Sequence, residues 1–207
     1  MSDEIRPFTV DVPDDVLVDL RNRVRGTRWP DQLDGSGWTY GTDRAYLQQL
    51  CATWADGFDW RPWEERLNCY EQFVTEIDGV DVHFLHVRSM APDALPMIMT
   101  HGWPGSVLNF LPVIDPLTDP VAFGVEPAHA FHLVIPSLPG YGFSGKPTEP
   151  GWDVQRIPEA WAVLMERLGY DHYVAQGGVW GSMVSSRLAA QDPEHCAALH
   201  LNLVLGM

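Results

Sequence analysis

A short glycine-rich segment is the part of this sequence best suited to hold a reactive side chain. Residues 176–182 read Gln-Gly-Gly-Val-Trp-Gly-Ser, between an apolar stretch that predicts a strand and one that predicts a helix. Small residues let a strand and a helix pack closely around a sharp turn. The central residue, Val179, is then presented at the end of the sheet, beside the backbone N–H that follows it. The pattern is typical of a nucleophile turn, but an ordinary strand-to-helix connection would also fit it.

Two other loops could build the walls of the same site. Residues 101–106 read His-Gly-Trp-Pro-Gly-Ser directly after a predicted strand, a position from which a backbone N–H can point at an oxyanion. We expect the His101 ring itself to be structural rather than catalytic. Residues 136–144 read Pro-Ser-Leu-Pro-Gly-Tyr-Gly-Phe-Ser, which is too rich in glycine and proline for a regular element. They form either a rigid surface loop or one wall of an active-site mouth.

The elements that must position these loops begin after about residue 75. Asp78-Gly79 separates two apolar runs and is a strong hairpin signal. The further predicted elements are strands at 97–100, 133–135, 173–175 and 199–204, a helix over 154–168 with Pro158 in its first turn, and a helix from Gly181 to about Ala190. A hairpin followed by alternating strands and helices predicts a mostly parallel sheet with helices on both faces.

The last of these strands, 199–204, would lie at an open sheet edge with little charge. An uncovered apolar edge is a template for pairing with another strand. We therefore expect either that the chain is a fragment of a longer protein, or that this edge pairs with a second chain or a second copy.

The segment before residue 75 has a different texture. Helices are predicted from Pro13, with Asp14 and Asp15 in the first turn, and behind Thr42 as the N-cap. Four tryptophans lie between and after these helices in chain that is predicted to be irregular: Trp29, Trp38, Trp60 and Trp63. Too little regular structure is predicted to bury them. We therefore expect residues 1–75 to wrap around a core formed by residues 76–207.

The composition limits the partners of the protein. Its net charge is −15, from 28 acidic and 13 basic residues. Such a surface repels nucleic-acid phosphates and anionic lipid headgroups, so we expect neither a nucleic-acid nor a membrane partner. No charged, apolar leader is recognisable and no apolar run approaches the ~18 residues of a membrane span, which predicts a cytoplasmic protein. Three scattered cysteines suit a reducing compartment, and no ligand spacing predicts a metal or a cofactor.

In this order and spacing, the three motifs together resemble those of epoxide hydrolases of the α/β-hydrolase fold, in particular the microsomal and juvenile-hormone type. That type begins with an N-terminal meander similar to residues 1–75, and the resemblance covers essentially the whole chain. It implies an α/β fold class. The chain would form the N-terminal part of a mostly parallel α/β-hydrolase sheet, preceded by a Trp-rich helical and irregular meander, with the cap domain and the last strands absent.

The resemblance also implies a mechanism. An aspartate at position 179 would attack an epoxide carbon to give an alkyl-enzyme ester, and water activated by a His–acid pair would hydrolyse that ester to the diol. The backbone N–H groups of Trp103 and Trp180 would form the oxyanion hole. The substrate would be a small apolar epoxide. The remaining site-lining residues would be His101, Gly102, Pro104, Gly178, Tyr141 and Phe143.

The sequence departs from this family at the reacting atom. Val179 has no lone pair to form the ester, so the chain is predicted to be inactive, and a β-branched residue is strained at the positive φ that the family usually has there. Asp153 is the only acid placed to stand in, and we do not expect it to do so. His195 and His200 are interpreted as structural, since the family's base, acid and cap tyrosines would follow residue 204. Two alternatives stay open: a non-catalytic binding or partner-docking protein, and a related hydrolase such as a haloalkane dehalogenase.

Overall fold

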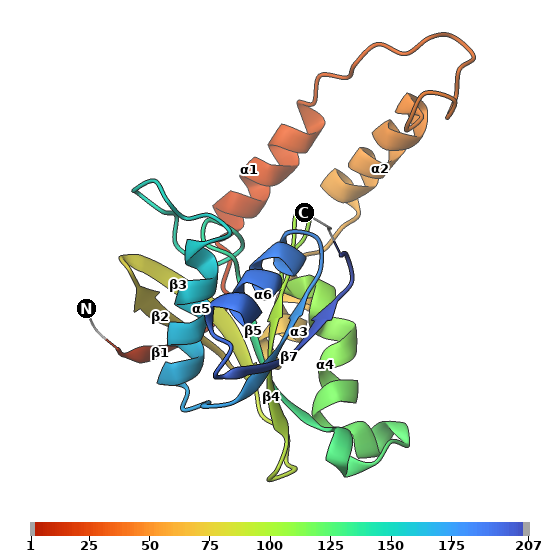
Figure 1. The fold of residues 1–207 in the computed structure, drawn as a ribbon. Helices are drawn as coiled ribbons and strands as arrows, with labels where there is room; N and C mark the ends of the chain where they lie inside the picture. Colours follow the sequence, from red (N-terminus) through yellow and green to blue (C-terminus); the bar gives the residue numbers. More distant parts are fainter. Residues whose placement is uncertain (1–2, 205–207) are drawn as a thin grey trace. The chain divides into compact units, whose positions relative to one another are not determined.

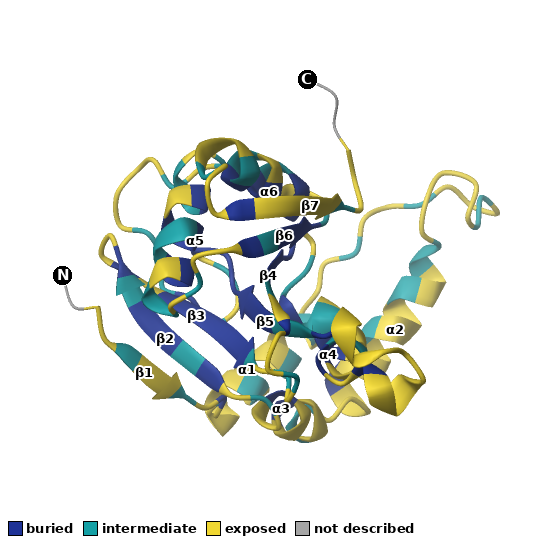
Figure 2. Ribbon diagram, turned by 60° about the horizontal axis from the view of Figure 1, so that its bottom comes forward, coloured by how far each residue is buried: buried dark blue, intermediate teal, exposed yellow. Residues whose placement is uncertain are grey.

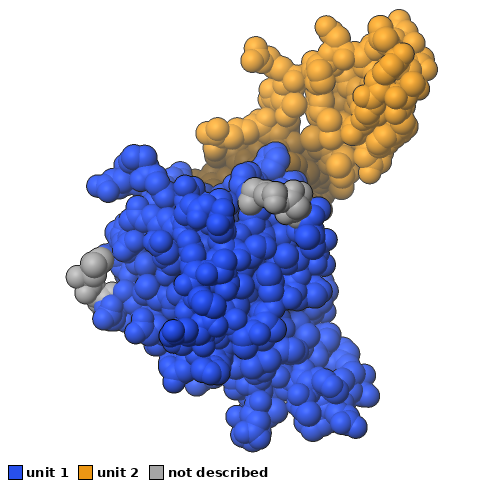
Figure 3. Space-filling model, viewed as in Figure 1, with its two compact units in different colours: residues 1–9, 67–207 blue, residues 10–66 orange. Residues whose placement is uncertain are grey.

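The computed structural model describes residues 3–204 and groups the chain into two compact units. One unit spans Val10–Arg66, and the other joins the residues before Val10 to those from Leu67 onward, as the colours of Figure 3 show. The first strand of the chain thus belongs with the larger unit. The expected wrapping of residues 1–75 around the rest stays a prediction.

A mixed sheet forms the centre of the larger unit. Its strands lie in the order β1-β2-β3-β5-β4-β6-β7. Their bounds are β1 (Ile5–Phe8), β2 (Gln72–Ile77), β3 (Val80–Val87), β4 (Leu95–Thr100), β5 (Phe131–Pro136), β6 (Tyr173–Gly177) and β7 (Cys196–Leu201). Pairing is antiparallel from β1 through β3 to β5, and parallel among β5, β4, β6 and β7 (Figure 1). The α/β class is confirmed, with the parallel pairing confined to the half of the sheet that contains β6.

The predicted hairpin is confirmed in β2 and β3. The two strands pair in register up to Ile77 and Val80, and both turn residues have positive φ, 50° at Asp78 and 77° at Gly79. Positive φ at both central positions is the requirement of a type I′ turn, whose twist matches that of the strands it joins.

Helices cover both faces of the sheet. On one face, α5 (Arg156–Arg167) and α6 (Trp180–Gln191) close a core that includes Trp161 and Leu188. On the other, α4 (Leu111–Thr118) packs against β5. The connections around α4 contain the 3₁₀ turns η1 (Val107–Phe110), η2 (Pro120–Phe123) and η3 (Pro127–His129). Figure 2 shows the central strands as the buried layer between these helices.

The prediction for α5 is confirmed in detail. Pro158 lies buried in the first turn, where a missing backbone N–H breaks no helical hydrogen bond. Trp161 is fully buried and its Nε1 donates to Thr100 Oγ1 at 3.1 Å. This bond fastens α5 to the end of β4, just before the loop that begins at His101.

The last strand lies earlier in the sequence than predicted. The expected range was 199–204, whereas β7 runs from Cys196 to Leu201. β7 ends at Leu201 because its partner strand, β6, ends at Gly177, the residue in register with Leu201. No further residue of β6 is available for pairing. The prediction that this strand lies at a sheet edge is confirmed within the described residues. Leu199 is 41% exposed.

The smaller unit consists mainly of helices. Its elements are α1 (Asp14–Arg25), α2 (Arg44–Asp56) and the start of α3 (Arg61–Asn68), and α1 packs against α2. The predicted N-cap Thr42 is wrong by one residue. The Asp43 carboxylate accepts from Tyr46 N at 2.9 Å, and this backbone bond lowers the pKa of Asp43. Trp63, predicted to lie in irregular chain, is part of α3.

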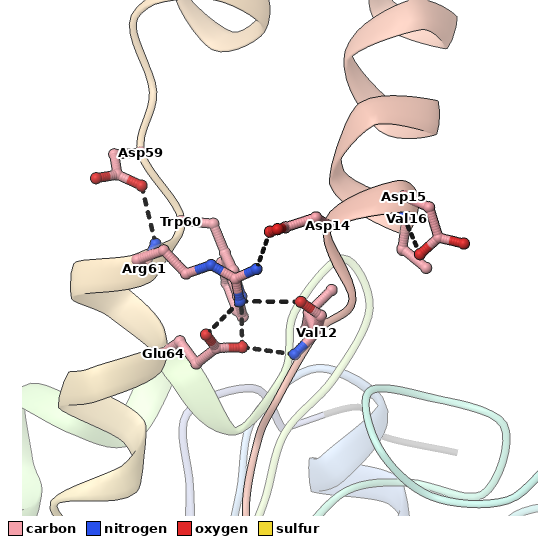
Figure 4. A network of polar contacts seen from close by, with 8 residues as sticks. All are labelled: Val12, Asp14, Asp15, Val16, Asp59, Trp60, Arg61 and Glu64. Atoms are coloured by element: carbon pink, nitrogen blue, oxygen red, sulfur yellow. Dashed lines mark hydrogen bonds and ion pairs between the residues drawn. The ribbon is translucent and has the colours of Figure 1, made fainter.

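A buried carboxylate ties the beginnings of α1 and α3 together (Figure 4). Glu64 Oε1 accepts from Val12 N at 2.7 Å and from Trp60 Nε1 at 3.1 Å. Arg61 Nη1 donates to Glu64 Oε2 at 2.6 Å and to Val12 O at 2.9 Å, and its other terminal nitrogen donates to Asp14. The backbone hydrogen bond from Val12 is the largest cause of the lowered pKa of Glu64. Part of the Trp-rich segment is therefore organised by a satisfied polar cluster.

Candidate active site

Val179 forms a sharp elbow between the end of β6 and the start of α6. Its backbone angles are φ 54° and ψ −118°. A β-branched side chain at positive φ is a genuine outlier, because its Cβ crowds the neighbouring carbonyl groups. The elbow thus keeps a positive φ with valine at its centre and does not relax to another geometry. The Val179 side chain is 48% exposed, so burial does not force it into this conformation.

The glycines around the elbow are required by close backbone contacts. A Cβ on Gly181 would lie 1.9 Å from Thr100 O, and one on Gly177 would lie 2.0 Å from the carbonyl oxygen of Gly181. No side chain can be accommodated at such distances. The glycines at positions 177 and 181 therefore reflect direct contact between β6, α6 and the end of β4.

The loop that follows β4 meets the elbow at Gly102. A Cβ added to Gly102 would lie 2.5 Å from Val179 Cβ, 2.8 Å from Gly178 O and 3.0 Å from Trp180 N. Four of the predicted site residues are thus brought together. Trp103 follows directly, in a cis peptide bond to Pro104, and its side chain is exposed. Pro104 is exposed as well.

His101 connects this loop to the loop after β5. Its ring is buried, Nε2 accepts from Leu138 N at 3.1 Å, and Nδ1 lies 3.0 Å from Gly102 O. A carbonyl oxygen only accepts, so Nδ1 carries the proton and the ring is the neutral Nδ1–H tautomer. Burial lowers the pKa of His101, which favours the neutral form. Both ring nitrogens are occupied by backbone groups, consistent with the expected structural role.

The Gly- and Pro-rich loop presents its two aromatic residues to different neighbours. The Tyr141 ring lies 5.8 Å from the His101 ring, on the side of the elbow. Phe143 instead packs against Phe8 and His83, at centroid distances of 5.5 Å and 5.3 Å. Of these two aromatic residues, both predicted to line the site, the structure brings only Tyr141 to it.

A pocket of about 340 Å³ lies on the flank of α6 and includes Tyr141 and Trp180. Most of its walls are formed by residues outside the predicted site. They come from the loop after β5, the segment entering α5, and the buried face of α6: Leu138, Pro139, Trp152, Asp153, Val154, Ile157 and Val184. The sequence predicts only that these residues lie in a loop or a helix. It does not predict that they meet, because they come from three separate parts of the chain.

Asp153, the acid placed to stand in for the nucleophile, is engaged elsewhere. Asp153 Oδ1 accepts from Gln155 N at 2.8 Å and from Arg156 N at 3.2 Å. These backbone bonds lower the pKa of Asp153, and they commit its carboxylate to the start of α5. A stand-in role for Asp153 has no support from this geometry.

The structure also contains a close His–Asp pair, but this pair lies at the start of β6, whereas the elbow follows its end. His195 Nδ1 is 2.5 Å from Asp192 Oδ1, and Tyr173 OH donates to Asp192 Oδ2 at 2.6 Å. The hydrogen bond to Asp192 raises the pKa of His195. Tyr173 begins β6 and the elbow follows its end, so the length of the strand, roughly 3.3 Å per residue, separates the pair from Val179.

Two further features of the described chain bear on the kind of site. No three His, Cys, Asp or Glu side chains within residues 3–204 gather into a set that could hold a metal ion. None of the helices in that range is both long and apolar enough to cross a membrane.

Comparison with known families places the chain. Residues 5–110 match the family described as the epoxide hydrolase N terminus, and residues 96–204 match the alpha/beta hydrolase fold. A candidate epoxide hydrolase of Stigmatella aurantiaca (strain DW4/3-1) is 49% identical over 201 residues, which is 97% of this chain and 46% of that protein. Epoxide hydrolase 1 of Sus scrofa is 38% identical over 98% of this chain and 46% of its own length. This chain spans about half the length of these curated relatives.

Solved structures give the same result. The epoxide hydrolase of Aspergillus niger superimposes with a TM-score of 0.86 at 37% identity, over 99% of this chain and 53% of that one. The juvenile hormone epoxide hydrolase of Bombyx mori superimposes with a TM-score of 0.87 at 32% identity, over 99% and 48% respectively. The chain therefore belongs to the epoxide hydrolase family, on the α/β-hydrolase fold.

Proposed function

We propose that the chain is the N-terminal part of a protein built to open a small apolar epoxide, and that it is inactive with valine at position 179. The observation that supports this most strongly is the elbow itself. Val179 has the strained backbone and half-exposed side chain that suit a nucleophile, yet a valine side chain can neither attack carbon nor form an ester.

The surroundings of Val179 suit the proposed chemistry. Among the described residues, the N–H groups of Trp103 and Trp180 make no hydrogen bond, and the Gly102 contact brings the two segments together. Both donors are therefore available to an oxyanion. With aspartate at 179, a carboxylate oxygen would attack an epoxide carbon while the C–O bond opens and the epoxide oxygen takes a proton from the tyrosines of the family's cap domain, which would follow residue 204. Water would then cleave the ester, with the oxyanion of the tetrahedral intermediate held by the two N–H groups.

The first test is turnover by the purified chain with a small aryl epoxide. We expect no diol from the chain as it is. Val179→Asp alone should also give no turnover, because the base, acid and cap of the family would follow residue 204. In a chain extended to the length of the relatives, Val179→Asp should restore diol formation and Val179→Asn, which has the same shape without the charge, should not. An inactive extended Val179→Asp protein would contradict this account of Val179.

A second candidate function is a non-catalytic protein that docks a partner. It is favoured by the open edge of β7, where Leu199 is 41% exposed, followed by Leu203 at 42% and Val204 at 75%. Pairing along this edge, by a second chain or a second copy, would cover these side chains. Sedimentation equilibrium showing a monomer throughout the accessible concentration range would count against self-association. The expected absence of nucleic-acid and membrane partners belongs to both proposals and is supported by the net charge of −15. The cytoplasmic location stays a prediction.

A further inference from the structure

A fully buried histidine, His83, lies in β3 outside the site described above. Its Nδ1 is 2.9 Å from Ser137 Oγ and its Nε2 is 3.0 Å from Gln72 Oε1. The Gln72 amide nitrogen donates to Leu67 O and Asn68 Oδ1, which fixes its oxygen toward His83. An amide oxygen only accepts, so Nε2–H donates to Gln72 and Nδ1 accepts from the Ser137 hydroxyl.

The backbone around His83 holds both ends of the loop that follows β5. Ser137 N donates to His83 O at 2.8 Å. Ser144 Oγ accepts from His83 N at 3.0 Å and donates to Ser137 O at 2.7 Å. The rings of Phe8 and Phe143 lie against the imidazole, at 4.9 Å and 5.3 Å. A neutral, desolvated imidazole therefore sits at the centre of a closed set of hydrogen bonds, and burial lowers its pKa to about 4.

The next residue of the loop carries this arrangement to the elbow. Leu138, bonded in sequence to Ser137, donates its N–H to His101 Nε2 at 3.1 Å, and His101 Nδ1 donates to Gly102 O at 3.0 Å. Gly102 lies against Val179 and Trp180 N. A path of hydrogen bonds and one peptide link thus runs from β2 to Gly102, which packs against the turn that presents residue 179.

We propose that His83 is a positioning residue for the active-site elbow. By holding Ser137 it fixes Leu138 N, which selects the Nδ1–H tautomer of His101 and so sets the orientation of the Gly102–Trp103 peptide. The meaning of this role rests on the proposed function, because that peptide would supply one oxyanion donor. The hydrogen bonds themselves are present whether or not the chain turns over.

The test is a set of NMR spectra of the whole chain and its variants. Long-range ¹H–¹⁵N spectra report the tautomer of His101, and amide spectra report Leu138, Gly102 and Trp103. Ser137→Ala removes the hydroxyl that donates a hydrogen bond to His83 Nδ1. His83→Phe removes both ring bonds, and His83→Asn retains an acceptor near the position of Nδ1. His86→Phe is the matched control, because His86 is also buried in β3 and is bonded to Tyr170 OH at 2.8 Å, away from the loop.

We expect Ser137→Ala and His83→Phe to give His101 a mixture of tautomers, to shift the Gly102 and Trp103 amides, and to speed hydrogen exchange of the Leu138 amide on the order of tenfold. His83→Asn should restore most of the native pattern, and His86→Phe should leave it unchanged. The proposal is wrong if folded Ser137→Ala keeps a single His101 tautomer with native Gly102 and Trp103 shifts. It is equally wrong if His86→Phe shifts these signals as strongly as His83→Phe does. Ser137→Ala removes one hydroxyl, so it provides the decision even if His83→Phe fails to fold.

Discussion

Among the described residues, two turns of the larger unit place a residue other than glycine at positive φ, and they differ in almost everything else. Asp78 has φ 50° in the hairpin between β2 and β3, and Val179 has φ 54° at the elbow. Aspartate tolerates positive φ through local hydrogen bonds, whereas valine does not. A Cβ on Gly79 would meet nothing within 4 Å, but one on Gly181 would collide with the backbone of Thr100. The hairpin is therefore relaxed and replaceable, while the elbow is strained and crowded.

Lowering the pH should produce the largest loss of stability. It acts through two histidines of β3, the strand that follows the hairpin turn. Burial lowers the pKa of both His83 and His86 to about 4, below the ordinary value of 6.5. The folded state thus binds fewer protons, so the stability that these groups support is present above pH 6.5 and is lost as the pH falls toward 4. Together they should remove on the order of 4 kcal/mol of unfolding free energy between pH 7 and pH 5. Urea midpoints across this range measure it.

The control for the acid effect is His86→Phe, which should abolish about half of the pH dependence. His195 acts in the opposite direction, since its hydrogen bond to Asp192 raises its pKa. The stabilisation it gives is present at low pH and is lost as the pH rises through the raised value. A urea midpoint that stays constant from pH 7 to pH 5 would contradict the neutral, buried state of the two β3 imidazoles.

Alanine in place of the turn glycines tests the difference in crowding. Gly181→Ala places a methyl group against Thr100 O, a backbone atom that cannot move aside, and should destabilise the fold by about 3 kcal/mol or more. Gly79→Ala meets no atom and should destabilise it by only about 1 kcal/mol, from its positive φ. Chemical denaturation of the pair measures both values. Equal losses would show that the elbow is less crowded than described.

Glycine at the central positions tests the difference in strain. Val179→Gly should stabilise the fold by about 1 kcal/mol, because the relief of backbone strain exceeds the loss of a half-exposed side chain. Asp78→Gly should change stability by less than about 0.5 kcal/mol, since aspartate already tolerates the turn. Thermal unfolding of both variants gives the comparison. A destabilised Val179→Gly protein would mean that packing around the valine outweighs its strain.

The smallest expected effect concerns the ion pair of the hairpin. Arg156 Nη2 lies 3.2 Å from Asp78 Oδ2, and both side chains are partly exposed. Asp78→Asn keeps the turn geometry and removes the charge, so stability should fall by less than about 0.5 kcal/mol, with little dependence on salt. A larger loss that disappears in high salt would show that charge, as well as turn geometry, maintains the hairpin.

Local signals explain which elements could be predicted from the sequence. The hairpin, α5 and the elbow each carry a chemical pattern within a few residues, and all three were recognised. β1 was not, because it is four residues long, contains Pro7, and gains its partner β2 from far along the chain. α4 was missed because Pro112 and Pro116 interrupt its helical pattern. The site was predicted where residues adjoin the motifs, whereas the orientation of Phe143 and the pocket wall at Trp152 depend on tertiary packing.

The pairing of β1 with β2 makes the smaller unit an insertion within a β-hairpin. Phe8 is in register with Gln72, so residues 9–71 form a single loop that closes between two adjacent strand ends. Closing so long a loop rather than a four-residue one lowers the entropy of the chain by an amount equivalent to about 2 kcal/mol. A chain in which a short turn replaces residues 10–66 should therefore close the β1–β2 pair faster.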